Sequence, residues 1–400
     1  MQTMNTRNNI GIDARLWNET GVGRYIRNLV CELQAIDQDI AYTLFILEKD
    51  KEEVTSYITN PRFKIRTTDI VWHTLNEQWN FPKIIEKEHI DLMHFPYFSM
   101  PIFYKGPYIL TIHDVILHNF PTGKASTRSW FIYQLKHLGY LYVMSQAVRK
   151  SLKIITVSHA TKHEIVKHLR VPIEKITVIY EGVDKNISNK DINYSLPTAN
   201  YFLYVGNAYP HKNLQRLLEA FASLKAQEKY SLRGTPAKFR SKEIKTLDTR
   251  LIFIGKRDFF YKRLEEKVKE MGLGNSIVFK HNVTDEELAK YYSNALALIA
   301  PSLMEGFGLT LLEAMAKGCL IAASNIPAFQ EIAQNVPVYF DPLDTNSLEN
   351  VLESIAKGEI EDEEERKSKG KERAKQFSWK EMAQKTQEVY TGCLSVRQGK

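Results

Sequence analysis

Two glutamates flank a glycine turn in the stretch PSLMEGFGLTLLEAMAKG, residues 301–318. Glu305 directly precedes the Gly-Phe-Gly tripeptide at 306–308, and Glu313 follows inside an apolar run. The residues before the turn, ALALIAPS, predict a buried strand, so the turn leads from a strand into a helix. Glycines at such a point let a ligand approach the backbone closely. The free N–H groups at a helix start attract phosphate.

Acidic side chains beside an anion site indicate that hydroxyl groups are also bound there. An ionised glutamate accepts two or more hydrogen bonds from neighbouring hydroxyls. One carboxylate would hold a sugar ring and the other a ribose, with a diphosphate between them. This is the order of groups in a sugar nucleotide. The alternative, from this motif alone, is a capped helix that carries two incidental acids.

The elements that must position these residues follow an alternating pattern. Short β-rich runs alternate with helical patterns, which predicts parallel sheets built from β-α-β units. The pattern stops in a polar, aperiodic stretch at 185–200 and restarts with the apolar run YFLYVGN. The chain has 400 residues, which is long for one core. We predict an α/β fold with two doubly wound Rossmann-like domains, at 1–190 and 198–376. A C-terminal helix at 377–400 is expected to cross back to the first domain.

Three segments depart from this pattern. The polar stretch at 226–248 is longer than most connections between a helix and a strand, and we predict a mobile basic insertion there. The dense charges of 358–376 are more typical of a solvated helix than of a binding tail. Asp-Gln-Asp at 37–39 has the DxD pattern of some metal sites. It falls at an expected exposed turn, and we predict no metal site there.

The stretch at 301–318 resembles the E-x7-E signature of retaining glycosyltransferases with the GT-B fold, especially family 4. The resemblance covers nearly the whole chain and is more specific in its second half. NIGIDARLWNETGVGRYIRNL resembles that family's opening strand and glycine loop. The segments TIHDV, ITVSHATKHEI, VIYEGVD, YVGNAYPHKNLQRLLEAF and FKHNVTDEELAKYYSNA follow in the family's order. The resemblance implies two domains that face across a cleft, the first for the acceptor and the second for a nucleotide sugar.

The resemblance also assigns roles at the donor site. In the family the first glutamate meets the donor sugar's hydroxyls and the second meets the ribose; these are Glu305 and Glu313 here. Lys212 matches a lysine that neutralises the diphosphate. The arginine that usually accompanies this lysine is absent, because its position is Asn207, and His211 stands where relatives often carry an arginine. Other residues expected to offer backbone groups to the donor are Gly306, Phe307, Gly308 and Leu309 for the sugar and phosphate, and Val283 for the nucleobase.

In the first half, the resemblance points to a glycine loop and a histidine. Gly21 and Gly23 lie between the first strand and its helix; a lone GVG is often only a turn, but here it implies a loop that closes over the diphosphate from the opposite domain. Arg24 fits a phosphate contact, an acceptor contact or an ordinary first helical turn. His113, which ends the strand YILTIHDV, matches a histidine that faces the donor sugar; a structural role is the alternative. Capping or turn formation explains Asp114 as well as a functional role does.

These residues predict a retaining hexosyltransferase of surface polysaccharide synthesis. It would move a hexose from a nucleotide-diphosphate sugar to a hydroxyl of a glycan or a lipid-linked acceptor. Openings similar to GIDAR…GVGRY occur in enzymes that use mannose or rhamnose, and we favour GDP-mannose as the donor. The donor is a substrate, and we predict no cofactor and no metal. Two alternatives stay open: a sugar-nucleotide 2-epimerase of the same architecture, and a non-catalytic protein that binds sugar nucleotides.

Charge and hydropathy indicate where in the cell the protein is expected and which partners it could bind. No apolar run approaches the 18 or so residues that span a bilayer, and the polar N-terminus, MQTMNTRNN, lacks the apolar core of a signal peptide, so we expect a cytoplasmic protein. The net charge is +7, and residues 105–175 hold 11 Lys and Arg against 3 Asp and Glu. This excess fits either a solvated face or a surface for anionic lipid or a phosphorylated substrate. No nucleic-acid motif accompanies it, and we expect no nucleic-acid partner.

The helix predicted at 130–150 is rich in aromatic residues and has basic edges. This composition suggests a lipid-linked acceptor and peripheral contact with the inner face of an anionic membrane. Packing of the aromatic side chains in the protein core is the alternative.

Overall fold

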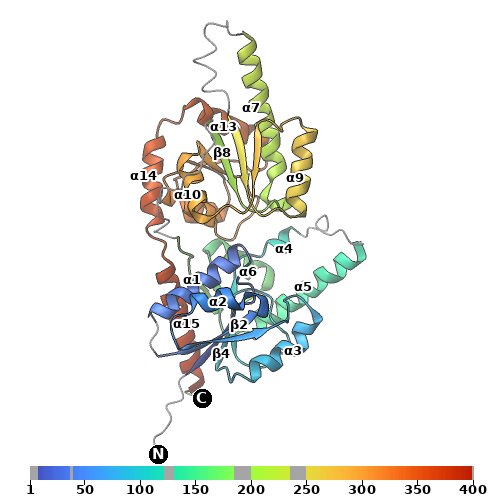
Figure 1. Ribbon diagram of the computed structural model, residues 1–400, viewed down its shortest axis with the longest axis vertical. Helices are drawn as coiled ribbons and strands as arrows, with labels where there is room; N and C mark the ends of the chain where they lie inside the picture. The colour runs from blue at the N-terminus through green and yellow to red at the C-terminus, as the bar shows by residue number, and fades with distance from the viewer. Residues whose placement is uncertain (1–7, 37–38, 121–129, 184–199, 235–248, 399–400) are drawn as a thin grey trace, which may run out of the picture. The chain divides into compact units, whose positions relative to one another are not determined.

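Two compact units make up the protein (Figure 1). The computed structural model describes residues 8–36, 39–120, 130–183, 200–234 and 249–398. Unit 1 comprises Met1–Gly182 together with Phe377–Lys400, and unit 2 comprises Val183–Gln376. The predicted linker at 185–200, apart from its last residue, lies outside the described residues, as do the first two residues of the Asp-Gln-Asp sequence.

Unit 1 is built on a seven-stranded parallel sheet with the order β3-β2-β1-β4-β5-β6-β7. Its strands are β1 (Asn9–Asp13), β2 (Ala41–Leu47), β3 (Phe63–Thr68), β4 (Leu92–Phe95), β5 (Tyr108–Ile112), β6 (Ile154–Thr156) and β7 (Ile176–Val178). The central strands β4 and β5 are buried along their whole length. This continuous burial is typical of a parallel sheet covered on both faces.

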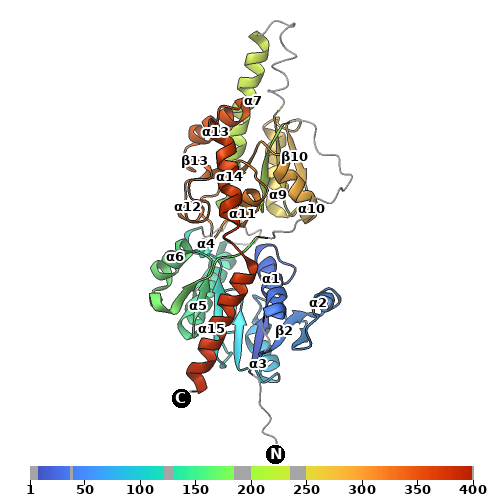
Figure 2. The ribbon, with the colours of Figure 1, turned by 90° about the vertical axis from the view of Figure 1, so that its left-hand side faces the viewer.

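The helices of unit 1 include one from the far end of the chain. They are α1 (Gly21–Ile36), α2 (Lys51–Tyr57), α3 (Leu75–Glu86), α4 (Ile116–Asn119), α5 (Trp130–Lys150), α6 (His159–Leu169) and the C-terminal α15 (Trp379–Gln398). Helix α15 packs against α1 and β4 (Figure 2). The last segment of the sequence therefore belongs to the same unit as the first strand.

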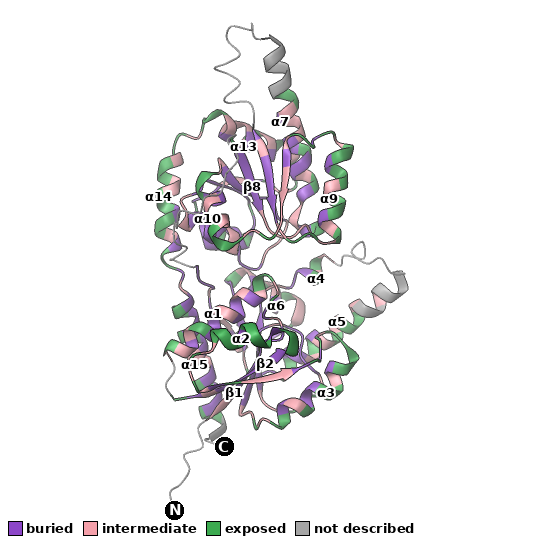
Figure 3. Cartoon of the chain, viewed as in Figure 1, coloured by how far each residue is buried: buried purple, intermediate pink, exposed green. Residues whose placement is uncertain are grey.

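Unit 2 repeats the arrangement with six parallel strands in the order β10-β9-β8-β11-β12-β13. Its strands are β8 (Tyr201–Val205), β9 (Arg250–Ile254), β10 (Ile277–Lys280), β11 (Ala297–Ala300), β12 (Ile321–Ser324) and β13 (Val338–Phe340). Its helices are α7 (Leu214–Gly234), α9 (Phe259–Glu270), α10 (Asp285–Asn294), α11 (Leu309–Ala316), α12 (Pro327–Ala333), α13 (Thr345–Lys357) and α14 (Glu363–Ala374). The strands are largely buried, and the outer sides of helices such as α9 and α14 are exposed (Figure 3).

Both sheets reverse their strand order once. The reversal lies between β1 and β4 in unit 1 and between β8 and β11 in unit 2. In doubly wound sheets the loops that leave the two flanking strands run in opposite directions and make room for a ligand at the carboxyl ends of the strands. The fold therefore marks one candidate ligand position in each unit.

One prediction about secondary structure was wrong in part. The polar stretch 226–248 was expected to be a mobile insertion, but α7 continues through its first nine residues to Gly234, and only 235–248 lie outside the described residues. Residues 226–234, AQEKYSLRG, include strong helix formers, and their lack of an apolar face hid the helix. The charged stretch 358–376 forms α14, whose lysines pair with glutamates on the same helix, such as Lys367 with Glu363.

A buried chain of polar side chains joins α15 to the sheet of unit 1. Tyr390 on α15 lies 2.6 Å from Nδ1 of His94, and Nε2 of His94 lies 2.8 Å from the Thr111 hydroxyl. Thr111 in turn contacts the Tyr25 hydroxyl at 3.2 Å. Burial, and then the nearby His113, lower the pKa of His94 to about 3. The imidazole is therefore neutral at pH 7, which lets one nitrogen donate and the other accept.

The His94 chain predicts an acid-sensitive unit 1. Because the folded-state pKa of His94 lies below its ordinary value, the unfolded chain binds the proton first as pH falls from about 6.5. The stability that neutral His94 provides is complete above that pH and falls by about 1.4 kcal/mol per pH unit below it. Native-state hydrogen exchange of the β4 and β5 amides at pH 7.5 and 5.5 measures this change. His94→Gln should lower the pH dependence by about that amount, whereas the exposed His163→Gln should not; equal pH dependence in all three proteins contradicts the assignment.

Candidate active site

The loops at the strand-order reversal of unit 2 bring a lysine and a glutamate into contact. Lys212 ends the short turn Pro210–Lys212 after β8, and Glu305 lies in the loop after β11. Nζ of Lys212 is 2.6 Å from Oε1 of Glu305, and each side chain is 16% exposed. The Ser302 hydroxyl donates to the same carboxylate oxygen at 2.7 Å. The Leu303 amide, which donates to the His211 carbonyl at 2.8 Å, ties the two loops together.

Burial and neighbouring groups shift the pKa values of Glu305 and His211. Burial on its own would raise the pKa of Glu305, but the contact with Lys212 and the proximity of His211 outweigh it, and the net effect lowers the pKa. Burial, and then Lys212 beside it, lower the pKa of His211 to about 4. His211 is therefore neutral at pH 7, although it stands where an arginine is common. The positive charge in contact with Glu305 comes from Lys212.

The turn after Glu305 ends at the start of helix α11. Gly308 caps that helix with a φ of 102°, in the left-handed region that favours glycine. A β-carbon there would lie 2.9 Å from the Phe329 ring, so close packing also requires glycine. Phe307 is buried, and Leu309 is the first helical residue. The positive end of the α11 dipole therefore adjoins the turn that follows Glu305.

The second glutamate of the motif is held by a tyrosine. Glu313 lies within α11, and its Oε2 accepts a hydrogen bond of 2.9 Å from the hydroxyl of Tyr292 on α10. Glu313 is 7% exposed and Tyr292 2%. The contact fixes the orientation of the carboxylate. Nothing in the sequence marks Tyr292, which is one of two adjacent tyrosines in a helical pattern.

Asn207 and Val283, both predicted to bind the donor, lie in loops of unit 2. The side-chain oxygen of Asn207 accepts from the Tyr209 amide at 3.3 Å, and its carbonyl accepts from the Tyr204 hydroxyl at 2.5 Å. Asn207 thus shapes the turn that leads to Lys212. Val283 is half-buried in the loop between β10 and α10. Because all strands of the sheet are parallel, both residues lie at its carboxyl edge, as Glu305 does.

The predicted residues of unit 1 gather around the ends of β1 and β5. Gly21 and Gly23 begin α1; a β-carbon on Gly23 would lie 2.4 Å from the Trp17 carbonyl oxygen, whereas one on Gly21 would meet nothing within 4 Å. His113 follows β5, and its Nδ1 lies 3.1 Å from Oε1 of Glu181. Its Nε2 lies 3.1 Å from the Pro96 carbonyl oxygen.

Sequence reasoning missed Glu181, a buried carboxylate that contacts His113 from the segment after β7. The Arg24 amide donates a hydrogen bond to the Thr20 carbonyl at the start of α1. The Asp114 carboxylate accepts a hydrogen bond from the Ile116 amide, which is a turn contact.

Comparison with known proteins places the chain in a class. A family model for "Glycosyl transferases group 1" matches residues 187–376, and a model for "Glycosyltransferase Family 4" matches residues 20–186. Together the two models span residues 20–376, which is nearly all of unit 2 and most of unit 1. The chain belongs to the glycosyltransferases that these two models describe, with two Rossmann-like domains of the GT-B type.

Individual relatives carry related names. The chain is 26% identical to the O-antigen chain mannosyltransferase RfbU of Salmonella typhimurium over 76% of this chain and 75% of that one. It is 24% identical to the O-antigen chain mannosyltransferase B of Escherichia coli over 70% and 69% of the two chains. Sucrose-phosphate synthase of Thermosynechococcus elongatus shares the fold, with a TM-score of 0.75, 18% identity and coverage of 98% and 100%.

In the part of the chain that the structure describes, no helix combines the length and the apolar composition of a membrane span. No group of three or more His, Cys, Asp or Glu side chains in the same part of the chain is arranged to hold a metal ion.

The contact between Lys212 and Glu305 predicts a measurable coupling. Removing either partner leaves the other largely buried without its opposite charge. Lys212→Met and Glu305→Gln should therefore each lower the free energy of unfolding of unit 2. The double variant should lose less than the sum of the two single losses. We expect a coupling free energy of about 1–3 kcal/mol. Hydrogen exchange of the β8 and β11 amides measures it in unit 2 alone.

The surface pair Lys357–Glu353, in which the lysine is 54% exposed, provides the matched control. The same double-variant cycle there should give a much smaller coupling, because water and salt screen an exposed pair. Coupling at Lys212–Glu305 no larger than in this control would show that the contact contributes nothing specific.

Proposed function

We propose that the protein is a retaining hexosyltransferase that uses a nucleotide-diphosphate hexose, with GDP-mannose favoured, and a hydroxyl acceptor in surface polysaccharide synthesis. The observation that carries this proposal is the contact of Lys212 with Glu305 at the strand-order reversal, beside the start of α11. The names of the O-antigen mannosyltransferase relatives support mannose as the sugar. The donor is a substrate, and the proposal includes no cofactor or metal.

The chemistry follows from the side chains at this point. On donor binding Lys212 exchanges the Glu305 carboxylate for the diphosphate, and Glu305 accepts hydrogen bonds from the sugar hydroxyls. Breaking the glycosidic bond loads negative charge onto the leaving phosphate, where Lys212 and the N–H groups at the start of α11 stabilise it. The departing phosphate takes the acceptor proton, so Glu305 orients the sugar and does not attack it. Glu313, held by Tyr292, binds the ribose.

The first test is substitution at the site. Glu305→Gln keeps the shape but loses the charge that accepts the sugar's hydrogen bonds, and Lys212→Ala loses the cation at the leaving group. Each should lower the transfer rate by about a hundredfold or more. The assay follows GDP release from GDP-mannose with octyl α-mannoside as acceptor, and proton NMR gives the anomeric configuration of the product. The exposed Glu359→Gln is the control and should transfer at the wild-type rate.

The outcomes separate the alternatives. Wild-type turnover by Glu305→Gln would reject the assignment. An inverted product would reject retention. A changed sugar nucleotide, formed from GDP-mannose with no acceptor present, would indicate an epimerase. Tight donor binding without nucleotide release would indicate a binding protein.

We also propose that α5 contacts an anionic membrane, which would bring the enzyme to a lipid-linked acceptor. Leu138 and Tyr142 are 61% and 58% exposed, and with the exposed Arg149 they fall on one face of the helix. Lys150 is also exposed at its end. Tyr140, by contrast, packs against Phe98 at 5.0 Å between ring centroids and belongs to the interior. Apolar and basic side chains on one exposed face suit an interfacial helix.

Vesicle binding tests this surface. The protein should sediment with vesicles of phosphatidylglycerol and phosphatidylcholine, and binding should survive moderate salt because the apolar contacts are not screened. The double variant Leu138→Glu/Tyr142→Glu should lose most of the bound fraction. Phe259→Glu, at an exposed aromatic position in unit 2, should not. No sedimentation of the wild type at low salt rules the membrane contact out.

A further inference from the structure

A strained residue stands at the surface of unit 1. His73 lies between β3 and α3 with a φ of 60°, in the left-handed region, and its side chain is exposed. Residues other than glycine adopt this conformation uncommonly, and histidine is among those that do so more readily. Such a conformation persists where the surroundings enforce it, and it is common at binding sites.

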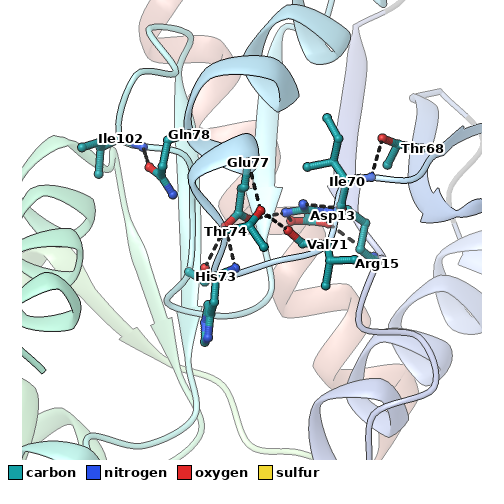
Figure 4. Close-up of polar contacts among 11 residues, drawn as sticks. Asp13, Arg15, Thr68, Ile70, Val71, His73, Thr74, Glu77, Gln78 and Ile102 are labelled. Atoms are coloured by element: carbon teal, nitrogen blue, oxygen red, sulfur yellow. Dashed lines mark hydrogen bonds and ion pairs between the residues drawn. The ribbon is translucent and has the colours of Figure 1, made fainter. Parts of the chain in front are cut away.

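A buried ion network enforces the conformation of His73 (Figure 4). Oε2 of Glu77 accepts a hydrogen bond of 2.8 Å from the His73 amide, and Oε1 of Glu77 accepts one of 2.6 Å from Arg15. Arg15 also donates to both carboxylate oxygens of Asp13, at 2.8 and 2.7 Å, and to the Ile70 carbonyl at 3.1 Å. Arg15 therefore holds the end of β1, the loop after β3 and the start of α3 together.

The network is sealed from water. The side chains of Arg15 and Glu77 are 1% and 0% exposed, and the guanidinium lies 3.7 Å from the centre of the Phe81 ring. Breaking a buried ion pair is strongly destabilising, because it leaves a charge without its partner. The loop at 70–74 is thus fixed to the sheet, and the ring of His73 is presented from a rigid base.

Two further aromatic rings lie next to the His73 ring. Tyr97 and Phe98 follow β4, and their rings lie 6.0 and 5.6 Å from the His73 ring between centroids. The His73 and Tyr97 rings are inclined by only 24°. Tyr97 is half-buried and Phe98 buried beneath them. Because β4 flanks the strand-order reversal of unit 1, the cluster lies where doubly wound sheets bind ligands.

We propose that His73 and Tyr97 form the subsite that holds the sugar ring of the acceptor. The His73 and Tyr97 rings stack on one another. The ring faces turned away from this stack offer electron-rich surfaces on which the C–H face of a pyranose packs, and the imidazole and phenol groups offer hydrogen bonds to its hydroxyls. The subsite rests on the proposed function, since it supplies the acceptor of that transfer. It selects a hexoside acceptor over one without a sugar ring.

The test removes each ring and keeps the backbone. His73→Asn retains a residue that tolerates the left-handed conformation, and Tyr97→Leu retains apolar bulk. Each should raise the KM for octyl α-mannoside about three- to tenfold, the range expected for one lost ring contact, and leave the KM for GDP-mannose unchanged. Trp79→Ala, an exposed aromatic on α3 outside the cluster, should change neither. An acceptor KM that stays the same in both variants, or rises equally in Trp79→Ala, overturns the subsite.

A binding measurement separates this inference from the proposed function. Saturation-transfer NMR should detect octyl α-mannoside bound to the wild-type protein and a much weaker signal with His73→Asn. That result without any hexose transfer would overturn the proposed function and support the subsite. The absence of a signal with the wild type, or an equal signal with His73→Asn, overturns the subsite whatever the transfer assay shows.

Discussion

A carboxylate largely shielded from water stays ionised only beside a cation or several hydrogen bonds. In unit 2 this constraint falls on Glu305, and Lys212, 93 residues away in the sequence, meets it together with Ser302. The two loops can meet because β8 and β11 are neighbours in the sheet and leave it at the same edge. The position where the fold leaves room for a ligand and the position where the carboxylate needs its cation are therefore the same.

The Lys212–Glu305 pair and the Arg15–Glu77 pair differ in exposure, and that difference indicates their roles. Lys212 and Glu305 are each 16% exposed, so a ligand can exchange with either of them. Arg15 and Glu77 are 1% and 0% exposed, so their contacts are not available for exchange. The first pair is suited to binding, whereas the second fixes a loop. Ion pairs of similar charge thus have different roles, because one is partly exposed and the other is fully buried.

Sequence reasoning reached the features that are local. The strand, glycine turn and helix around Glu305 are contiguous, and hydrophobic periodicity predicted the α/β fold with its two parallel sheets. It missed Tyr292, Glu181 and the Arg15–Glu77 pair, whose partners lie 21, 68 and 62 residues apart. No local spacing marks such contacts, since the packing of distant elements creates them. The end of α7 was missed for a different reason: the sequence of residues 226–234 has no apolar periodicity to distinguish a helix from a polar loop.

His113 shows how the structure refines a role that a motif assigns. Both of its ring nitrogens face acceptors, the Glu181 carboxylate and the Pro96 carbonyl. A neutral imidazole donates from one nitrogen only, so both contacts are hydrogen bonds together only when both nitrogens carry protons. Hydrogen bonds to a carboxylate are stronger than those to a neutral carbonyl. The Glu181 contact at Nδ1 is therefore the stronger of the two and fixes the orientation of the ring, whereas the Pro96 contact at Nε2 is the weaker.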